Sequence, residues 1–166
     1  MELEERMTEL ERRIAALESA DRTAPGMGEG DFWALEGLKE QLAELKAADG
    51  GVLFTGAVRL PTGERYDWQH GALTSELLTY EWPDAAESFA ALGHPVRLRL
   101  LREIAGGRRT AAELAELDGV GTTGQIYHHL RQLTAAGWLH TTGRGRHEVP
   151  PGRVVPLLVA LSAARP

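Results

Sequence analysis

The residues that could do chemistry by type and spacing lie in "TTGQIYHHLRQLTAAGWLHTTGRGRHEV", positions 122 to 149. The first half has the apolar spacing of a helix, because steps of about 100° bring Leu130 and Leu133 to the same side as Ile126. The outward side then carries Gly124, Tyr127, His128 and Arg131. A helix that offers a phenol, an imidazole and a guanidinium on one face matches the width and hydrogen-bonding groups of a DNA major groove.

A β-hairpin is expected directly after this helix. The stretches 138–142 and 146–149 are rich in β-forming residues, and Gly143, Arg144 and Gly145 join them. An arginine at the tip of a protruding ribbon can reach a phosphate or the minor groove. A recognition helix over 122–136 and a wing over 138–149 together make a winged helix-turn-helix.

The elements that must position this segment begin after Pro83. The stretch "DAAESFAAL" over 84–92 predicts a first helix. A second begins with Pro95 at its first position and ends at Gly106 and Gly107. The side chains expected on its buried face are Val96, Leu100, Leu101 and Ile104.

Two capping boxes follow in close succession. Thr110 and Glu113 open a helix that should hold Leu114 and Leu117 and end at Asp118-Gly119. Thr122 and Gln125 open the next, where the hydroxyl accepts from a free backbone amide and the Gln side chain reaches back to the cap. Two capped helices therefore flank a short turn.

The final stretch "GRVVPLLVALSAA", from Gly152 on, is apolar nearly all round. A helix that lay alone on the surface would have a polar side. We therefore expect this stretch to form part of a dimer interface through Val154, Leu158 and Leu161. Packing into the core of its own subunit is the alternative. Pro156 is tolerable if this helix begins near Arg153, since the first four amides of a helix lack intrahelical partners.

Residues 84–164 resemble the arsenical-resistance-repressor (ArsR) superfamily of bacterial transcription regulators. The resemblance rests on "ALGHPVRLRLL", "TAAELAEL", "YHHLRQLTAAGWL" and the glycine-rich wing, in this order. It implies a homodimer that binds operator DNA and releases it on meeting an effector, often a metal ion. The resemblance and the outward direction of these side chains together indicate which residues contact DNA: Thr123, Gly124, Gln125, Tyr127, His128, Arg131, Arg144 and Arg146.

The sequence departs from that family where its members bind metal. The segment "ELAELDGV" has no cysteine, and the last helix lacks the family's His and Asp ligand pairs. His128 and His129 are adjacent on a helix and point about 100° apart, which is poor geometry for a shared metal. His94 stands where the family often has an Asp cap. We therefore expect no metal sensing, and place His129 on the core side.

The N-terminal residues 1–20 have the apolar seam of a heptad repeat. Its members are Leu3, Met7, Leu10, Ile14 and Leu17. Flanking arginines and glutamates at complementary positions favour a parallel two-stranded coiled coil that assists a dimer held elsewhere. An amphipathic helix folded back on its own subunit is the alternative.

Residues 31–83 predict an accessory region after a Gly- and Pro-containing linker over 21–30. Asp31 is expected to cap a helix that has leucines at 35, 38, 42 and 45 and that ends at Asp49. A hairpin follows, in which Val52, Phe54, Val58 and Leu60 share one face of the first strand. The aromatic residues of this region either line a small-molecule pocket or belong to the core: Tyr66, Trp68, Tyr80 and Trp82.

Composition limits the function classes. The 166 residues include no cysteine and carry a net charge of −6. Residues 1–83 hold 8 basic and 17 acidic side chains, whereas residues 84–166 hold 10 and 7, and all 10 are arginine. The positive half suits a phosphate backbone, because electrostatic footprints are local. No phosphate-cradling glycine motif, cysteine nucleophile or metal set favours an enzyme.

The sequence thus predicts a mainly α fold with small β elements (α+β). The domains are a coiled-coil helix (1–20), a linker (21–30), the accessory region (31–83), and a winged helix-turn-helix with a C-terminal dimerisation helix (84–166). The expected function is a cytoplasmic, dimeric regulator of double-stranded DNA at roughly palindromic sites, without cofactor or membrane contact and with a possible small-molecule effector. A protein-association module, or a sensor that uses the aromatic hairpin, is the alternative.

Overall fold

The computed structural model describes Met7, Glu9, Arg12, Arg13 and residues 32–165. The chain divides into two compact units, 1–37 and 38–166. In the first unit Met7 is helical and 57% exposed, and Arg12 donates to both carboxylate oxygens of Glu9 at 2.9 Å. The other heptad residues, the linker and the predicted cap lie outside the described residues: Leu3, Leu10, Ile14, Leu17, 21–30 and Asp31. The coiled coil therefore stays a prediction.

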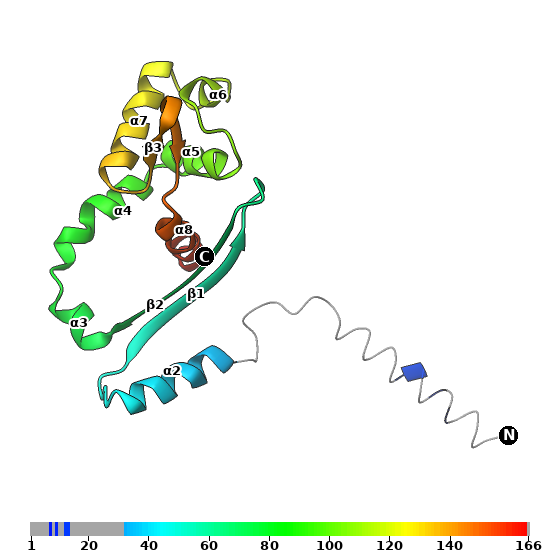
Figure 1. The fold of residues 1–166 in the computed structure, drawn as a ribbon, viewed down its shortest axis with the longest axis vertical. Coiled ribbons are helices and arrows are strands. Elements are labelled where there is room, and N and C mark those ends of the chain that lie inside the picture. The colour runs from blue at the N-terminus through cyan, green and yellow to red at the C-terminus, as the bar shows by residue number, and fades with distance from the viewer. Residues whose placement is uncertain (1–6, 8, 10–11, 14–31, 166) are drawn as a thin grey trace. The chain divides into compact units, whose positions relative to one another are not determined.

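The second unit is a mainly helical α+β structure with two small antiparallel sheets, and it forms a winged helix-turn-helix (Figure 1). After α2 (Trp33–Glu44) the elements are β1 (Gly51–Arg59), β2 (Arg65–Leu73), α3 (Thr74–Thr79), α4 (Ala86–Leu92), α5 (Pro95–Ala105), α6 (Ala111–Ala115), α7 (Thr123–Ala135), β3 (His140–Thr142), β4 (Arg146–Glu148) and α8 (Pro151–Ala163). Within the described residues, no helix has both the length and the apolarity to cross a membrane.

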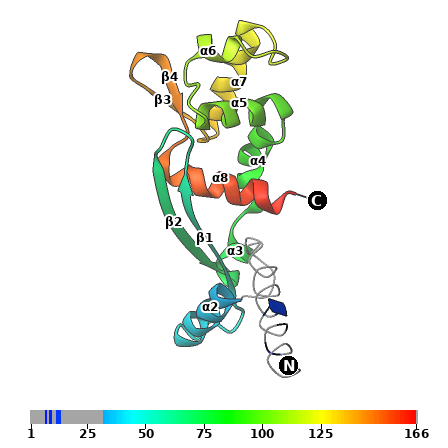
Figure 2. The ribbon, with the colours of Figure 1, turned by 90° about the vertical axis from the view of Figure 1, so that its right-hand side faces the viewer.

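The core of this unit lies between α5, α6, α7 and the base of the wing. The residues of α5 and α7 that are at most 2% exposed are Leu100, Leu101, Ile104, Ile126, Leu130 and Leu133. They are the inward residues that the helical spacing predicts. Trp138, at the base of the wing, is 5% exposed and donates from Nε1 to the carbonyl of Ser88, 3.1 Å away. The β3–β4 hairpin projects from one side of this core (Figure 2).

The helix starts follow the predicted signals closely. Thr110 and Thr122 each form a complete capping box, and Pro95 occupies the first turn of α5. His94 caps α5 with its imidazole, since Nδ1 accepts from the backbone N–H of Val96 at 3.2 Å. An unprotonated ring nitrogen therefore takes the place of a carboxylate or hydroxyl cap.

Three helix boundaries before α7 differ from the prediction. The helix expected to run from Asp31 to Asp49 ends at Glu44, so Leu45 lies in the turn after it. The helix predicted over 84–92 begins as a 3₁₀ turn (Trp82–Ala85) before α4. The helix opened by Thr110 ends at Ala115, so Leu117 lies in the following turn, where it still packs against the core. A short helix suffices there because its cap bonds and one buried leucine, Leu114, already hold it.

The hairpin of β1 and β2 pairs residue for residue, from Gly51 opposite Leu73 to Arg59 opposite Arg65. Val58 and Leu60 pack against the core, as their spacing predicts, but Val52 is 55% exposed because it lies near the open end of the hairpin. The middle of the hairpin rests on α8. A Cβ on Gly56 would lie 2.6 Å from Cγ1 of Val155, so the strand approaches the helix more closely than any other residue would allow.

The last helix corrects two expectations. α8 begins at Pro151, two residues before Arg153, so Pro156 lies inside the helix. Val154 is 4% exposed and belongs to the core of its own chain, so assigning it to a dimer interface is wrong. Leu158 and Leu161, on the other side, are 41% and 40% exposed. The helix is apolar nearly all round because one side packs on the hairpin and the core while the other remains uncovered in the single chain.

Candidate nucleic-acid interface

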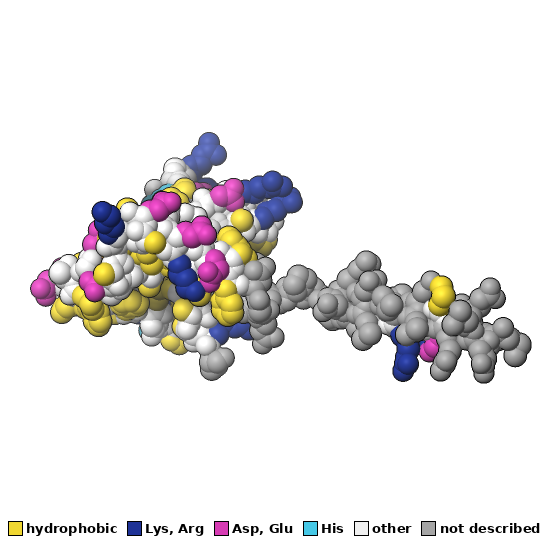
Figure 3. Space-filling view, turned by 90° about the horizontal axis from the view of Figure 1, so that it is seen from below, with side chains coloured by type: hydrophobic (Ala, Val, Ile, Leu, Met, Phe, Trp, Pro, Cys, Tyr) yellow, Lys and Arg dark blue, Asp and Glu magenta, His cyan; other side chains and the backbone are white. Residues whose placement is uncertain are grey.

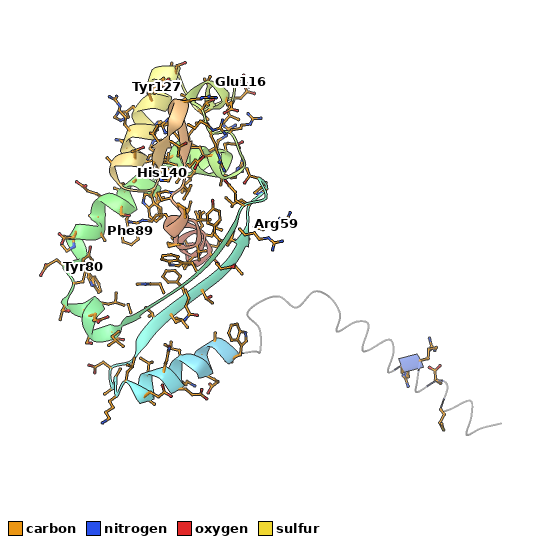
Figure 4. All side chains as sticks on the ribbon, viewed as in Figure 1. Arg59, Tyr80, Phe89, Glu116, Tyr127 and His140 are labelled. Carbon is orange, nitrogen blue, oxygen red and sulfur yellow. The ribbon has the colours of Figure 1, made fainter. Side chains whose placement is uncertain are left out.

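The outer face of α7 is uncovered. While Ile126, Leu130 and Leu133 face the core, the exposed positions are Thr123, Gly124, Gln125, Tyr127, His128 and Arg131. Tyr127 is 52% exposed and lies on the outer part of the winged domain (Figure 4). The helix therefore presents a phenol, an imidazole and a guanidinium to solvent within two turns.

The start of α7 uses one of the predicted contact residues for its own cap. Gln125 accepts from the backbone N–H of Thr122 through Oε1 at 2.8 Å, and its own N–H donates to the Thr122 hydroxyl at 3.3 Å. Gly121 has a φ of +94° and leaves room for the Gln125 side chain, which lies where a Cβ would be. The amide NH₂ of Gln125 and the second lone pair of Oε1 remain to contact a ligand.

The wing places Arg144 at its tip in a conformation that side chains rarely adopt. Arg144 has φ 66° and ψ 29°, in the left-handed region, and it is exposed. This conformation costs about 1 to 2 kcal/mol for a residue other than glycine. Arg146 is half-buried at the start of β4, where its backbone forms a bridge with Thr110. Arg144 and Arg146, which the sequence assigns alike to DNA contact, therefore differ in exposure.

The arginines after Pro83 divide into two sets. Most are held by the protein through hydrogen bonds, ion pairs or an aromatic ring: Arg97, Arg99, Arg102, Arg108, Arg109 and Arg153. Of the guanidinium groups that the structure describes in this half, those of Arg131, Arg144, Arg146 and Arg165 have no hydrogen bond or ion pair with the protein, and Arg146 interacts with the Glu113 carboxylate only through its charge. Three of these four are predicted DNA contacts.

Arg97 holds the helices around the interface together. Its guanidinium donates to the carbonyls of Ala90 and Ala91 at the end of α4, and to Oε1 of Gln132 on α7, each at 2.6 Å. These bonds satisfy carbonyls that a helix end otherwise leaves free. Arg97 is thus structural, which sequence reasoning missed because its partners come from separate helices.

Arg109 connects the wing to the β1–β2 hairpin. Its side chain is 13% exposed, with Nη1 2.8 Å from Oε1 of Glu148 in β4 and Nη2 2.5 Å from Oε2 of Glu64 in the hairpin loop. The hydrogen bond from Arg109 holds the pKa of the Glu64 carboxyl below its usual range. No local pattern signals this role, because the carboxylates lie far along the chain in both directions.

Three histidines near α7 are in ring contact, in tilted and edge-on arrangements. The rings of His94 and His129 have centroids 4.7 Å apart, and those of His128 and His129 are 5.9 Å apart. Burial lowers the pKa of His129, and the charge that His94, Arg97 and His128 carry when protonated lowers it further. Within the described residues, no three His, Cys, Asp or Glu side chains are grouped to hold a metal ion. His129 is half-buried, as its core-side position predicts.

The four aromatic residues proposed for a ligand pocket have different surroundings. Tyr66 packs against the core, and Trp68 covers Gly152 of α8 with its ring 3.5 Å from the position of a Cβ. Tyr80 and Trp82 are 50% and 65% exposed. Neither of the two pockets described in this unit is lined by any of the four.

Comparison with protein-family models matches residues 92–141 to a helix-turn-helix domain. The matched stretch runs from the end of α4 through α5, α6 and α7 into β3, and so contains the exposed face of α7. A comparison with curated proteins finds no match. The match supports a DNA-binding regulator rather than an enzyme.

Proposed function

We propose that this protein is an ArsR-like transcription regulator of the cytoplasm that inserts α7 into a major groove and lays its wing on the neighbouring backbone. The observation that carries the proposal is that Arg131 and Arg144 are exposed and have no partner within the described protein, whereas six other arginines of this half are bound internally. Unpaired guanidinium groups are available for phosphates and base edges.

The two arginines have different expected roles. Arg131 shares the outer face of α7 with Tyr127 and His128, so it is suited to bidentate bonds with a guanine edge. Arg144 stands at the tip of the wing, where a phosphate or the minor groove is in reach. Thr123 and Gly124, in the first turn of α7, would let the backbone approach a phosphate.

We further propose a homodimer on a roughly palindromic site. Leu158 and Leu161 of α8 supply exposed apolar surface for pairing, and the N-terminal heptad segment would assist it. Tyr80 and Phe89 add exposed aromatic surface along the segment from α3 to α4 (Figure 4). Two copies would present their α7 helices to major-groove faces about one turn apart.

The effector of this regulator is proposed to be something other than a metal held by cysteines. The chain has no cysteine, and the predicted histidine pair of α7 is poorly placed for one ion. This distinguishes it from family members that sense metal through the helix before the recognition helix.

The proposal can be tested by DNA binding of arginine variants. A cognate fragment is first recovered by sequencing the genomic DNA that co-purifies with the protein. Arg131→Ala should weaken binding to that fragment by about 1 to 3 kcal/mol and relax its sequence preference. Arg144→Ala should weaken binding to cognate and unrelated duplex alike, and reduce the slope of log K against log salt by about 1.

The matched control is Arg165→Ala, which removes an unpaired arginine outside the helix-turn-helix and wing. Its affinity should stay close to that of the wild type. If neither Arg131→Ala nor Arg144→Ala changes duplex binding, α7 and the wing are not the interface.

A protein-association module is the second candidate. The exposed aromatic residues favour it: Tyr80, Trp82 and Phe89 are at least 50% exposed, and large aromatic side chains are enriched at protein interfaces. This candidate predicts that the protein binds no duplex even at low salt.

A further inference from the structure

A pocket opens at the end of the β1–β2 hairpin that is remote from the wing. It is formed by α2, the first residues of β1, the last residues of β2, and Glu76 of α3, and it encloses about 350 Å³. This volume lies at the small end of the range for ligand sites. If each non-hydrogen atom takes about the 30 Å³ of liquid water, the pocket holds about ten to twelve of them.

The walls of this pocket are mostly aliphatic. Leu38 and Leu42 of α2, and Leu45 in the turn directly after it, line the pocket together with Leu53 of β1. The helix packs directly on the strand, since a Cβ on Gly51 would lie 3.3 Å from Cδ2 of Leu42. Close packing therefore closes one side of the cavity.

The mouth of the pocket leaves apolar surface in contact with water. Leu45 is 66% exposed and belongs to the pocket lining. The surface view of Figure 3 shows hydrophobic side chains reaching solvent among charged ones. An apolar ligand that entered between them would remove this surface from water.

Glu76 gives the pocket its charge. Among the described residues that line it, Glu76 is the one ionisable side chain, and Gln41 is the other polar side chain. One oxygen of Glu76, Oε2, accepts from the backbone N–H of Leu73 at 3.2 Å. In the described protein its other oxygen, Oε1, has no partner, and the residue is exposed at the mouth. A carboxylate at the opening of an aliphatic cavity favours a ligand that has a cationic group at one end of a hydrocarbon chain.

We propose that this pocket binds small apolar amines, with the hydrocarbon tail between the leucines of α2 and Leu53 and the ammonium group at Glu76. The site is separate from the DNA-binding face and does not rest on the proposed function. Simple eight-carbon probes fit its size: octylammonium, octanol and octanoate share one tail and differ in the charge of the head.

Isothermal titration of the full chain with the three probes tests the proposal without DNA. Octylammonium should bind about two- to fivefold more tightly than octanol, the effect of one exposed ion pair, and octanoate should bind more weakly than octanol. Glu76→Gln should abolish the preference for octylammonium. The control is Glu81→Gln, which removes a carboxylate outside the pocket lining and should keep the preference.

A second pair of variants tests where the tail binds. Leu45→Trp places a large side chain at an exposed position of the mouth and should reduce the affinity for all three probes at least fivefold. Leu78→Trp makes the same kind of change at a residue that is 66% exposed and outside the lining, and should have no effect. Circular dichroism and thermal melting of each variant establish that it is folded.

The proposal is overturned by any of three results: no probe binds, the three probes bind equally to the wild type, or Leu45→Trp leaves the affinities unchanged. Because duplex binding is measured separately on ligand-free protein, a failure here is distinguishable from a failure of the proposed DNA-binding function.

Discussion

The guanidinium of Arg109 and the carboxylate of Glu148 form an ion pair with 2.8 Å between Nη1 and Oε1, and this pair anchors the second strand of the wing. The other arm of Arg109 bonds Glu64 in the β1–β2 hairpin. One side chain therefore ties the accessory hairpin and the proposed DNA-contacting wing to the turn between α5 and α6. The backbone repeats the connection, since the carbonyl of Arg109 accepts from His147 N–H at 2.6 Å.

Arg109→Ala is expected to destabilise the fold by about 1 to 3 kcal/mol. Removing a mostly buried cation leaves two carboxylates without their partner, and the loss is less than for a fully buried pair because both carboxylates are partly exposed. Urea denaturation measures the change. Arg108→Ala, which removes a surface pair at 3.8 Å with Glu103, is the control and should stay within about 1 kcal/mol of the wild type. Equal effects of the two variants would contradict the role of Arg109.

The lowered pKa of Glu64 predicts that the free energy of unfolding falls at acid pH. Its carboxyl pKa is lowered, first by the hydrogen bond from Arg109 and then by that from Thr62, so the unfolded chain binds its proton at higher pH than the folded one. The stabilisation is present above the ordinary pKa of 4.5 and is lost as the pH falls below it. Glu64→Gln should lower stability at pH 7 and flatten its decline between about pH 5 and pH 3, measured by denaturation at each pH. An unchanged slope would show that the pair contributes nothing.

Arg144→Gly should raise the stability of the fold while it lowers the affinity for DNA. Glycine adopts the observed φ of 66° without strain, so stability should rise by about 0.5 to 1 kcal/mol after the entropy of the unfolded glycine is counted. Duplex affinity should fall, because the guanidinium is lost. Arg144→Ala removes the same charge but keeps the backbone strain, so it should lower the affinity for DNA without raising the stability. Thermal melts and anisotropy titrations check both. If Arg144→Gly binds as the wild type does, the strained arginine has no role on DNA.

Gly56 and Val155 should be coupled in stability. A methyl group on Gly56 would collide with Val155, so Gly56→Ala is expected to cost about 1 to 3 kcal/mol. Adding Val155→Ala should relieve part of that cost, giving a coupling of about 1 kcal/mol in a double-mutant cycle. Gly143→Ala is the control, since no atom lies within 4 Å of its Cβ position. Strict additivity of the two changes would show that the hairpin does not rest on α8 in solution.

His129 predicts a second pH effect near neutrality. Burial, and then repulsion by His94 when it is protonated and by Arg97, lower the pKa of His129 from the ordinary 6.5, so the unfolded state binds more protons in this range. Stability should therefore fall as the pH drops from about 7.5 to 5.5 and level off below the folded pKa. His129→Gln should reduce this slope without abolishing it, because burial also lowers the pKa of His147. His70→Gln, at an exposed position of β2 that does not affect His129, is the control for denaturation curves at pH 7.5, 6.5 and 5.5 and should leave the slope unchanged.

Much of the winged domain follows from signals within a few residues. The capping boxes of Thr110 and Thr122, the start of α5 at Pro95, and the buried stripe of α7 all depend on groups no more than one or two helical turns apart. Such local bonds and periodicities act in any context that allows a helix. For this reason the helices, the hairpins and the outward face of α7 could be predicted from the sequence.

Which arginine is free and which is held could be decided only by the tertiary structure. Arg109 and Arg131 are alike in the sequence, yet Arg109 finds carboxylates 39 and 45 positions away and Arg131 finds none in the described protein. The same holds for Val154 and Leu158, which share an apolar helix but face the core and solvent respectively. The pocket at α2 also needs three segments to meet. Chain composition sets which groups are present, but burial and charge pairing depend on distances between segments that no local pattern encodes.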